Sequence, residues 1–309
     1  MNERALREKG KGPGPETGIE IRKSICTICD PTTQCGLDLF VKDGKIIRVE
    51  GSKEAPHSHG SLCSKGAATR QYVYSPDRLK TPLRRVGERG EGKFEPISWD
   101  EALDEIAKNL NAAKAQYGPE SVIFFAGYPK HHRAFLQRLA MSFGSPNYCT
   151  ESSTCSTATI MAQQLTYGAP AAPDNGASAC MLMWSTNPAA SKTLICEGLF
   201  DRLDQGTKLI VVDPRVTPFA ARADIHLQLR PGTDGALALA MANVIIDENL
   251  YDADFVANWT VGFEEYAKLA AEMTPERAQD ITGVDANLIR EAARMYATTK
   301  PASIMTSAA

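Results

Sequence analysis

The sequence lacks several features that would assign it to a common class of protein. No stretch approaches the run of about 18 apolar residues that a membrane-spanning helix needs. Neither sign of charge dominates, since 34 lysines and arginines stand against 37 aspartates and glutamates and the net charge is −3. This balance gives no support to binding of nucleic acid or of an anionic membrane. Neither GxGxxG nor GxxxxGK[ST] is present, so the ordinary dinucleotide and P-loop nucleotide sites are unsupported.

The amino terminus also lacks the features of an export signal. Residues 1–20 are charged and rich in glycine and proline, with no apolar core region and no twin-arginine pair. They indicate a disordered leader, and we expect a cytoplasmic protein. Thiols are kept reduced in the cytoplasm, so the eight cysteines favour metal binding over disulfides.

Four of the eight cysteines have the spacing of metal ligands. Cys26 and Cys29 form a CxxC pair, Cys35 follows them, and Cys63 lies in the segment GSLCSKG. A zinc site normally uses two CxxC pairs, and only one is present here. Three clustered cysteines with one remote cysteine better suit the corners of a [4Fe–4S] cube. Burial as small apolar side chains is the alternative interpretation.

The segment LDLFVKDGKIIRVEG predicts a β-hairpin beside these cysteines. Two runs of β-forming residues flank Asp43 and Gly44, a pair suited to the positive φ angles of a tight turn. Such a hairpin can bring the loop of Cys26, Cys29 and Cys35 towards Cys63.

From residue 98 onward the sequence predicts an α/β fold. Ser98 and Glu101 form a capping box, and the amphipathic helix after them closes near Gly118. Nearly continuous apolar runs follow at 121–127, 179–185 and 207–213, each followed by a candidate helix. This alternation is typical of a doubly wound parallel sheet. We therefore expect a leader at 1–20, a small β-rich cluster domain at 21–78 and an α/β region at 79–309.

Three polar segments follow predicted strands of the α/β region. They are WSTNPAAS after 179–185, VVDPRVTPFAARAD after 207–213 and LRPGTDGAL after 223–229. Ligands of open α/β sheets bind at the carboxyl ends of strands. Asp213 can accept from ribose or guanine donors, Arg215 can face a phosphate, and Gly232 permits close backbone approach. Each segment alone is also consistent with a simple turn and helix cap.

The remaining cysteines divide into two kinds. Cys149 and Cys155 lie in a polar stretch ahead of a helical run, where a thiol with a lowered pKa can act as metal ligand or nucleophile. Cys180 and Cys196 lie in or beside apolar segments, and we interpret them as buried packing residues.

In their order along the chain, these motifs resemble those of molybdopterin oxidoreductases, the family that includes dimethyl sulfoxide reductase, formate dehydrogenase and polysulfide reductase. The resemblance begins near residue 22 and rests on the cysteines, GSLCSKG, ISWDEALDEIA, GSPN, STNP, VVDPR and RPGTDGAL. It implies a [4Fe–4S] domain followed by a region that binds two pterin–guanine dinucleotides, which hold molybdenum or tungsten. One protein side chain usually completes the coordination of that metal.

The resemblance also assigns roles to matching positions. It makes Lys65 a residue between cluster and pterin, on the electron path. It makes Cys155, eight residues after Asn147, the ligand of molybdenum or tungsten. The implied cluster ligands are Cys26, Cys29, Cys35 and Cys63. The implied dinucleotide contacts are Ser185, Asn187, Asp213, Arg215, Gly232, Thr233 and Asp234.

Two departures from the family pattern bear on the function. Five residues separate Cys29 from Cys35, where the family commonly has three, so the geometry of this loop differs. Ser156 follows Cys155, where formate dehydrogenases carry a histidine, and this disfavours formate oxidation.

Asp30, directly after Cys29, leaves a second reaction open. The tungsten-dependent acetylene hydratase branch of the family has an aspartate there that acts as a catalytic acid. A carboxyl group beside a cluster and away from water would have a raised pKa and could stay protonated near neutral pH. The alternative role of Asp30 is to cap the loop by bonding to backbone N–H groups.

The leading hypothesis is an oxidoreductase that transfers an oxygen atom, sulfur or hydride equivalent to or from a small substrate. Electrons would pass through the cluster to an iron–sulfur partner subunit, in an anaerobic setting. A non-redox tungsten hydratase is the alternative, and a cluster-bearing scaffold without pterins is a third. The chain ends in KPASIMTSAA, within a predicted strand, so we expect a missing C-terminal part and no activity of the chain alone.

Overall fold

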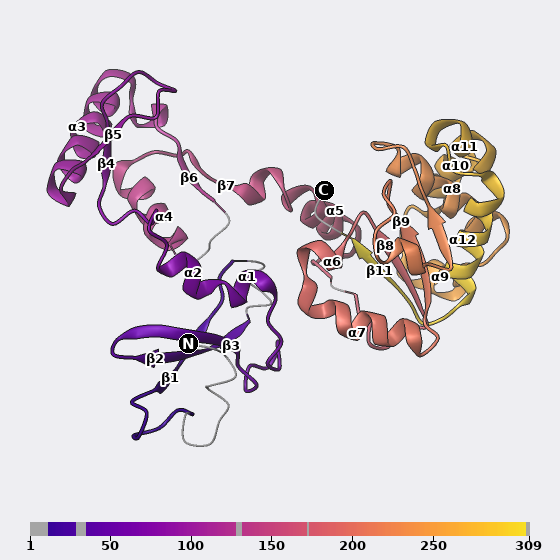
Figure 1. Ribbon diagram of the computed structural model, residues 1–309. Helices are drawn as coiled ribbons and strands as arrows, with labels where there is room; N and C mark the ends of the chain where they lie inside the picture. Colours follow the sequence, from indigo (N-terminus) through magenta and orange to yellow (C-terminus); the bar gives the residue numbers. More distant parts are fainter. Residues whose placement is uncertain (1–11, 29–34, 128–131, 172, 307–309) are drawn as a thin grey trace. The chain divides into compact units, whose positions relative to one another are not determined.

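The computed structural model describes residues 12–28, 35–127, 132–171 and 173–306 (Figure 1). By the contacts within the chain it divides into two units, one ending at Thr154 and the other starting at Cys155. None of the helices in these ranges is both long and apolar enough to cross a lipid bilayer.

An antiparallel sheet opens the first unit. Its strands lie in the order β1 (Glu20–Ile25), β2 (Gly36–Lys42) and β3 (Lys45–Gly51). The turn between β2 and β3 consists of Asp43 and Gly44, with φ angles of 50° and 72°. Two consecutive positive φ angles characterise the type I′ hairpin turn. The predicted hairpin is therefore confirmed.

Two short helices, α1 (Ser64–Ala67) and α2 (Thr69–Val73), follow this sheet and contact β3. The hydroxyl of Tyr74, just after α2, accepts a 2.8 Å hydrogen bond from the amide of Ile46 on β3. The chain therefore returns to the sheet after a loop, and Cys63 lies at the start of α1.

The first unit continues with a second set of elements. Helix α3 begins at the predicted capping box, in which the Ser98 hydroxyl accepts from the Glu101 amide and the Glu101 carboxylate accepts from the Ser98 amide. β4 and β5 form an antiparallel pair, and β6 and β7 form a parallel pair. The strand predicted at 121–127 is shorter and spans Phe124–Ala126, and Ser121 belongs to a 3₁₀ turn. The elements are β4 (Leu83–Arg85), β5 (Phe94–Pro96), α3 (Trp99–Tyr117), η2 (Pro119–Ser121), β6 (Phe124–Ala126), α4 (Arg133–Phe143), β7 (Tyr148–Thr150) and η3 (Glu151–Thr154).

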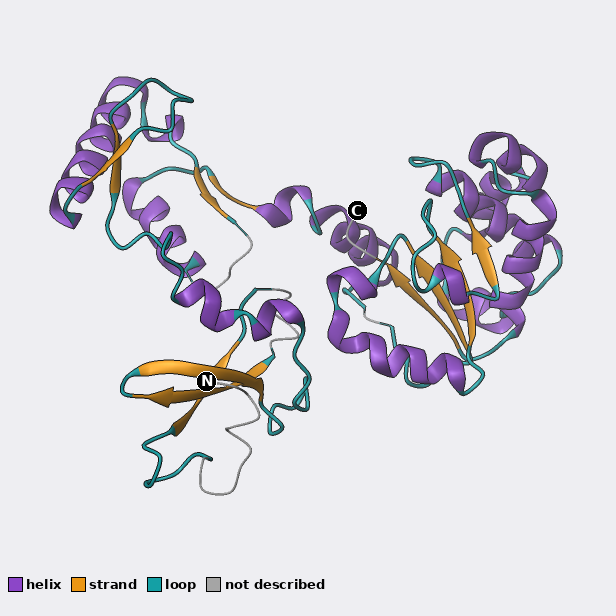
Figure 2. Cartoon of the chain, viewed as in Figure 1, coloured by secondary structure: helices purple, strands orange, loops and turns teal. Residues whose placement is uncertain are grey.

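The second unit is a parallel α/β sheet with helices on both faces (Figure 2). Its described strands are all parallel and lie in the order β10-β9-β8-β11. The strands are β8 (Cys180–Trp184), β9 (Lys208–Val212), β10 (Ile225–Leu227) and β11 (Ala302–Thr306). The helices are α5 (Thr157–Tyr167), α6 (Pro188–Ser191), α7 (Thr193–Asp204), η4 (Ala220–Arg222), α8 (Asp234–Asp247), α9 (Ala253–Trp259), α10 (Phe263–Ala271), α11 (Pro275–Thr282) and α12 (Ala286–Thr298).

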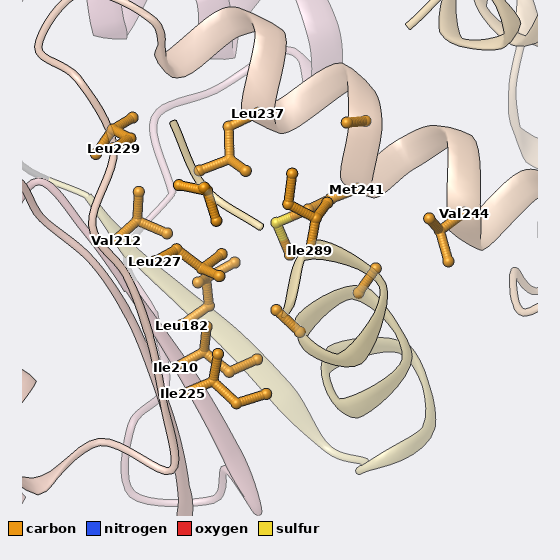
Figure 3. Close-up of a cluster of buried hydrophobic side chains, with 14 of the residues drawn as sticks. Leu182, Ile210, Val212, Ile225, Leu227, Leu229, Leu237, Met241, Val244 and Ile289 are labelled. Atoms are coloured by element: carbon orange, nitrogen blue, oxygen red, sulfur yellow. The ribbon is translucent and has the colours of Figure 1, made fainter. Parts of the chain in front are cut away.

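Side chains of the central strands alternate between two hydrophobic cores. On β8, Cys180 and Leu182 face the core formed with α8, α11 and α12, which Figure 3 shows in part. Met181 and Met183 face the other core, which includes Leu199 of α7. This period of two is the pattern of a strand buried on both faces. The predicted doubly wound parallel α/β fold is confirmed.

The strand order creates a switch point at β8. From β8 the chain crosses by α6 and α7 to β9 on one side, and the chain later returns by α12 to β11 on the other side. Open α/β sheets bind ligands at the carboxyl ends of the strands where the order reverses. The residues after β8 therefore occupy the position in this fold that is best suited to a ligand.

Candidate functional site

Two predicted cluster cysteines are neighbours across the base of the β1–β2 connection. The amide of Cys26 donates a 2.8 Å hydrogen bond to the carbonyl of Cys35, which extends the β1–β2 ladder by one pair. Both residues are buried. Cys29 and Asp30 lie outside the described residues. Among the described residues alone, no group of three or more potential ligands is arranged to hold a metal ion.

The loop at 52–61 brings Cys63 back towards this pair. The amide of Gly36, next to Cys35, donates to the hydroxyl of Ser58 at 3.3 Å, and Ser52 donates its amide to the carbonyl of Gly36 at 2.9 Å. A Cβ atom on Gly51 would overlap the carbonyl of Gly60, so the loop passes directly against the end of β3.

Helix α1 lies against the sulfur of Cys26. A Cβ atom placed on Gly66 would come within 3.7 Å of Cys26 Sγ. Cys63 precedes α1, and Lys65 lies on its exposed side. The structure thus brings Cys26, Cys35 and the helix that carries Cys63 and Lys65 into one region of the first unit.

No disulfide joins any two of the described cysteines. Burial, with a smaller contribution from the nearby Asp224 carboxylate, raises the pKa of Cys180 to about 11. Burial also raises the pKa of Cys196. A raised pKa keeps both thiols protonated near neutral pH. Cys180 is buried in one core of the sheet, as predicted, whereas Cys196 is only half-buried at the margin of the other core.

The two candidate ligands of the catalytic metal lie in different settings. Cys149 is half-buried on β7, whereas Cys155 is exposed ahead of α5. Glu151, which begins the turn η3 after β7, forms a half-buried ion pair with Arg133. Of the two thiols, that of Cys155 is the more accessible to a bound group.

The carboxyl end of β8 carries a strained residue and an unpaired acceptor. Ser185 has a φ of 50°, and its amide donates to the carbonyl of Val212 at 2.8 Å. Asn187 precedes α6, and its Oδ1 is buried without a hydrogen bond from any described residue. A buried acceptor of this kind normally has a partner. A bound molecule with an N–H or O–H donor would supply one.

The turn after β9 is held in place by residues of the neighbouring strand β10 and of the segment just after it. Asp213, which is buried, accepts a 2.8 Å hydrogen bond through Oδ1 from the amide of Arg215. His226 Nε2 lies 2.8 Å from the carbonyl of Asp213, and Gln228 donates to the carbonyl of Pro214 at 2.9 Å. His226 of β10 and Gln228 just after this strand thereby fix the backbone that presents Asp213 and Arg215.

The segment before α8 completes this edge. Gly232 has a φ of 83°, and no atom lies within 4 Å of a Cβ built there, so the backbone faces open space. The Thr233 hydroxyl donates to the carbonyl of Arg230 at 2.6 Å. The carboxylate of Asp234 accepts from Trp184 Nε1 at 2.8 Å and from the Ser185 hydroxyl at 3.3 Å.

The predicted dinucleotide residues therefore share one edge of the second unit. They offer an unpaired amide oxygen, two carboxylates, an arginine and open glycine backbone, which suit a ligand with phosphate groups and N–H donors. Sequence reasoning missed Trp184, His226 and Gln228. They lie within or beside the quoted motifs, but nothing in the sequence pairs Trp184 with a residue fifty positions later.

Comparison with known proteins gives the family. Residues 78–308 match the molybdopterin oxidoreductase family, and residues 19–75 match the molybdopterin oxidoreductase Fe4S4 domain. The chain belongs to the molybdopterin oxidoreductase family. The first match contains the strand-end residues, and the second contains the cysteines from Cys26 to Cys63. The family supports a [4Fe–4S] cluster and a pterin cofactor with molybdenum or tungsten.

Several characterised relatives match over most of this chain. Acetylene hydratase of Syntrophotalea acetylenica is 40% identical over 286 residues, which are 91% of this chain and 39% of the relative. The thiosulfate reductase molybdopterin-containing subunit PhsA of Salmonella typhimurium is 35% identical, over 91% of this chain and 37% of its own length. Formate dehydrogenase H of Escherichia coli is 37% identical, over 92% and 41%.

A solved structure agrees with these matches. Acetylene hydratase from Pelobacter acetylenicus superposes with a TM-score of 0.79 at 39% identity, covering 92% of this chain and 40% of that chain. The chain thus spans about 40% of the length of the relatives that it matches.

Proposed function

We propose that the chain is part of the catalytic subunit of a molybdenum or tungsten enzyme with two pterin–guanine dinucleotides and a [4Fe–4S] cluster. When bound, the metal–pterin group supplies transfer of an oxygen atom, sulfur or hydride equivalent. The proposal rests on the edge of the sheet at the carboxyl ends of β8, β9 and β10, which we call the switch-point edge. There the buried Oδ1 of Asn187 lacks a donor among the described residues, and the backbone of Gly232 faces open space.

Residues of this chain have separate tasks in the proposal. The switch-point edge binds and orients one dinucleotide through Ser185, Asn187, Asp213, Arg215, Gly232, Thr233 and Asp234. Cys155 supplies a soft thiolate ligand, the donor type that such metals accept. Lys65 places a positive charge between cluster and pterin, and the cluster ligands are Cys26, Cys29, Cys35 and Cys63. Hydrogen bonds around the cluster sulfurs and its burial tune the potential of the cluster.

The proposed reaction is redox, with a small-molecule substrate and an iron–sulfur subunit as electron partner. Relatives of similar identity act in different reactions, since their names include a reductase, a dehydrogenase and a hydratase. Ser156 after Cys155 argues against formate as the substrate.

A hydration reaction is the second candidate. Two observations favour it, the 40% identity and the TM-score of 0.79 to acetylene hydratases. In this candidate Asp30 acts as a proton donor, and the cluster serves as a fixed charge.

Metal analysis of the full-length gene product, purified without oxygen, tests the first proposal. About four irons with one molybdenum per chain would support the redox enzyme. Tungsten in place of molybdenum would favour the hydratase. Zinc without iron would contradict the cluster and the assignment of all four cysteines.

Substitution of Asp30 separates the two reactions. In a hydratase Asp30→Asn should lower activity by about 10²-fold or more, the usual contribution of a positioned acid. In a redox enzyme most of the activity with an artificial electron donor should remain. Asp43→Asn is the matched control, because asparagine also tolerates the positive φ of the hairpin turn.

A further inference from the structure

The carboxylate of Asp234 is held by two residues from a different strand. Its Oδ1 accepts from the indole Nε1–H of Trp184 at 2.8 Å and from the hydroxyl of Ser185 at 3.3 Å. Asp234 is the first residue of α8, and Trp184 is the last residue of β8. The bond therefore ties the helix start to the strand at the switch point.

The indole ring has little freedom to turn away from this bond. Trp184 is partly buried and packs against the core formed by β8–β10 and helices α8, α11 and α12. This packing limits rotation of the ring, whose N–H points to Asp234. Two donors on one oxygen then fix the rotation of the Asp234 side chain.

A fixed carboxylate matters for recognition because an ionised carboxylate is purely an acceptor. With Oδ1 held by Trp184, the carboxylate keeps one orientation. Guanine carries two adjacent donors, N1–H and the 2-amino group, which a carboxylate can accept side by side. Holding the acceptor in advance removes part of the ordering cost of binding.

We propose that Trp184 is a positioning residue that sets the Asp234 carboxylate for a guanine base. This inference rests on the proposed dinucleotide site and concerns a residue that does not itself touch the ligand. A simpler role, in which the bond only anchors α8 to β8, would contribute to stability and leave the choice of base unchanged.

Titration of the cofactor-free chain with GDP and IDP distinguishes these roles. Inosine keeps N1–H and lacks the 2-amino group, so the ratio of the two dissociation constants reports the reading of that group. Trp184→Phe keeps an aromatic ring and removes the N–H. We expect GDP binding to weaken by about tenfold, in the range of a hydrogen bond to a charged group, and the GDP/IDP preference to fall towards one.

Trp259→Phe is the matched control. Trp259 lies at the end of α9 and is 76% exposed. The control should bind GDP and IDP as the unaltered protein does. A Trp184→Phe protein with an unchanged GDP/IDP preference would overturn the inference, whatever its thermal stability.

A second measurement needs no ligand. The chain has three tryptophans, so ¹⁵N labelling gives three indole N–H signals. Asp234→Asn should shift the signal that Trp184→Phe removes and leave the other two in place. An unchanged signal would show that the Trp184–Asp234 bond is absent in solution, which also overturns the inference.

Failure of the proposed function has a different signature. If the unaltered protein binds neither GDP nor IDP, the dinucleotide edge itself is wrong, and the inference falls with it. If it binds GDP over IDP and Trp184→Phe does so equally, only the positioning role is wrong.

Discussion

The amide of Cys26 donates a 2.8 Å hydrogen bond to the carbonyl of Cys35, so two predicted cluster ligands are cross-strand neighbours. If both thiolates bind the cluster, Cys26→Ser and Cys35→Ser should each remove most of the iron, because a serine hydroxyl is a poor replacement for thiolate. Iron content and visible absorbance after anaerobic purification measure this.

Cys196→Ser provides the control for these variants. Cys196 lies on α7, near the core of the sheet, and its Sγ is 3.9 Å from the carbonyl of Lys192. Its replacement should leave iron content unchanged. Full iron in the Cys26→Ser protein would remove Cys26 from the ligand set.

The close approach of Gly51 and Gly60 makes a second prediction. A Cβ on Gly51 would overlap the Gly60 carbonyl, which is a backbone group and cannot turn aside as a flexible side chain can. Gly51→Ala should lower the free energy of unfolding by about 1–3 kcal/mol, the usual cost of overpacking. It should also reduce iron content, because the loop leads to Cys63. Urea denaturation and iron analysis measure the two effects.

Gly198→Ala is the matched control for Gly51→Ala. Gly198 lies within α7, and no atom lies within 4 Å of its Cβ position. Alanine there should stabilise the protein by about 0.5–1 kcal/mol, since glycine costs that much inside a helix. Equal effects of the two substitutions would contradict the close approach.

An ion pair at the start of β9 predicts a pH dependence. The Asp224 carboxylate accepts from Lys208 Nζ at 2.7 Å and from the Leu209 amide at 2.8 Å. Burial alone would raise the pKa of Asp224, but the Lys208 ammonium and the amide hydrogen bonds outweigh it and lower the pKa. The same hydrogen bond raises the pKa of Lys208.

The sign of the effect follows from these directions. A carboxyl with a lowered pKa binds protons less readily in the folded than in the unfolded chain, so its contribution is present above about pH 4 and lost as pH falls. Asp224→Asn should therefore reduce the melting temperature near pH 6 and have less effect near pH 3. Thermal unfolding across this range measures it. A difference that stays constant with pH would contradict the pairing.

Local sequence signals predicted the elements whose determinants lie close together in the chain. Asp43 and Gly44 alone set the hairpin turn, and Ser98 and Glu101 alone set the start of α3, since each pair acts within four residues. Apolar runs predicted β8 and β9 because both faces of these strands are buried.

Features that depend on distant residues could not be predicted in this way. The hydrogen bond between the Trp184 indole and the Asp234 carboxylate depends on the strand order, which brings Asp234 to the end of β8. The partner of β6 was missed because Tyr148–Thr150 is short and polar, and its pairing is set by the crossover through α4. The paired strands β4 and β5 have mostly exposed side chains, so no apolar pattern marks them.

The bond between His226 and the Asp213 carbonyl makes the last prediction. His226→Leu removes the donor while keeping an apolar side chain on β10, and it leaves a partly buried carbonyl without that bond. We expect a loss of about 1–3 kcal/mol in the free energy of unfolding, the cost of an unsatisfied buried acceptor. GDP binding should also weaken, because the turn that presents Asp213 and Arg215 loosens.

Gln228→Leu is the companion variant. Its bond to Pro214 is exposed to water, which can replace the lost donor, so its effect on unfolding should be smaller. Urea denaturation of both proteins gives the comparison, and a larger effect at Gln228 would contradict the role assigned to His226.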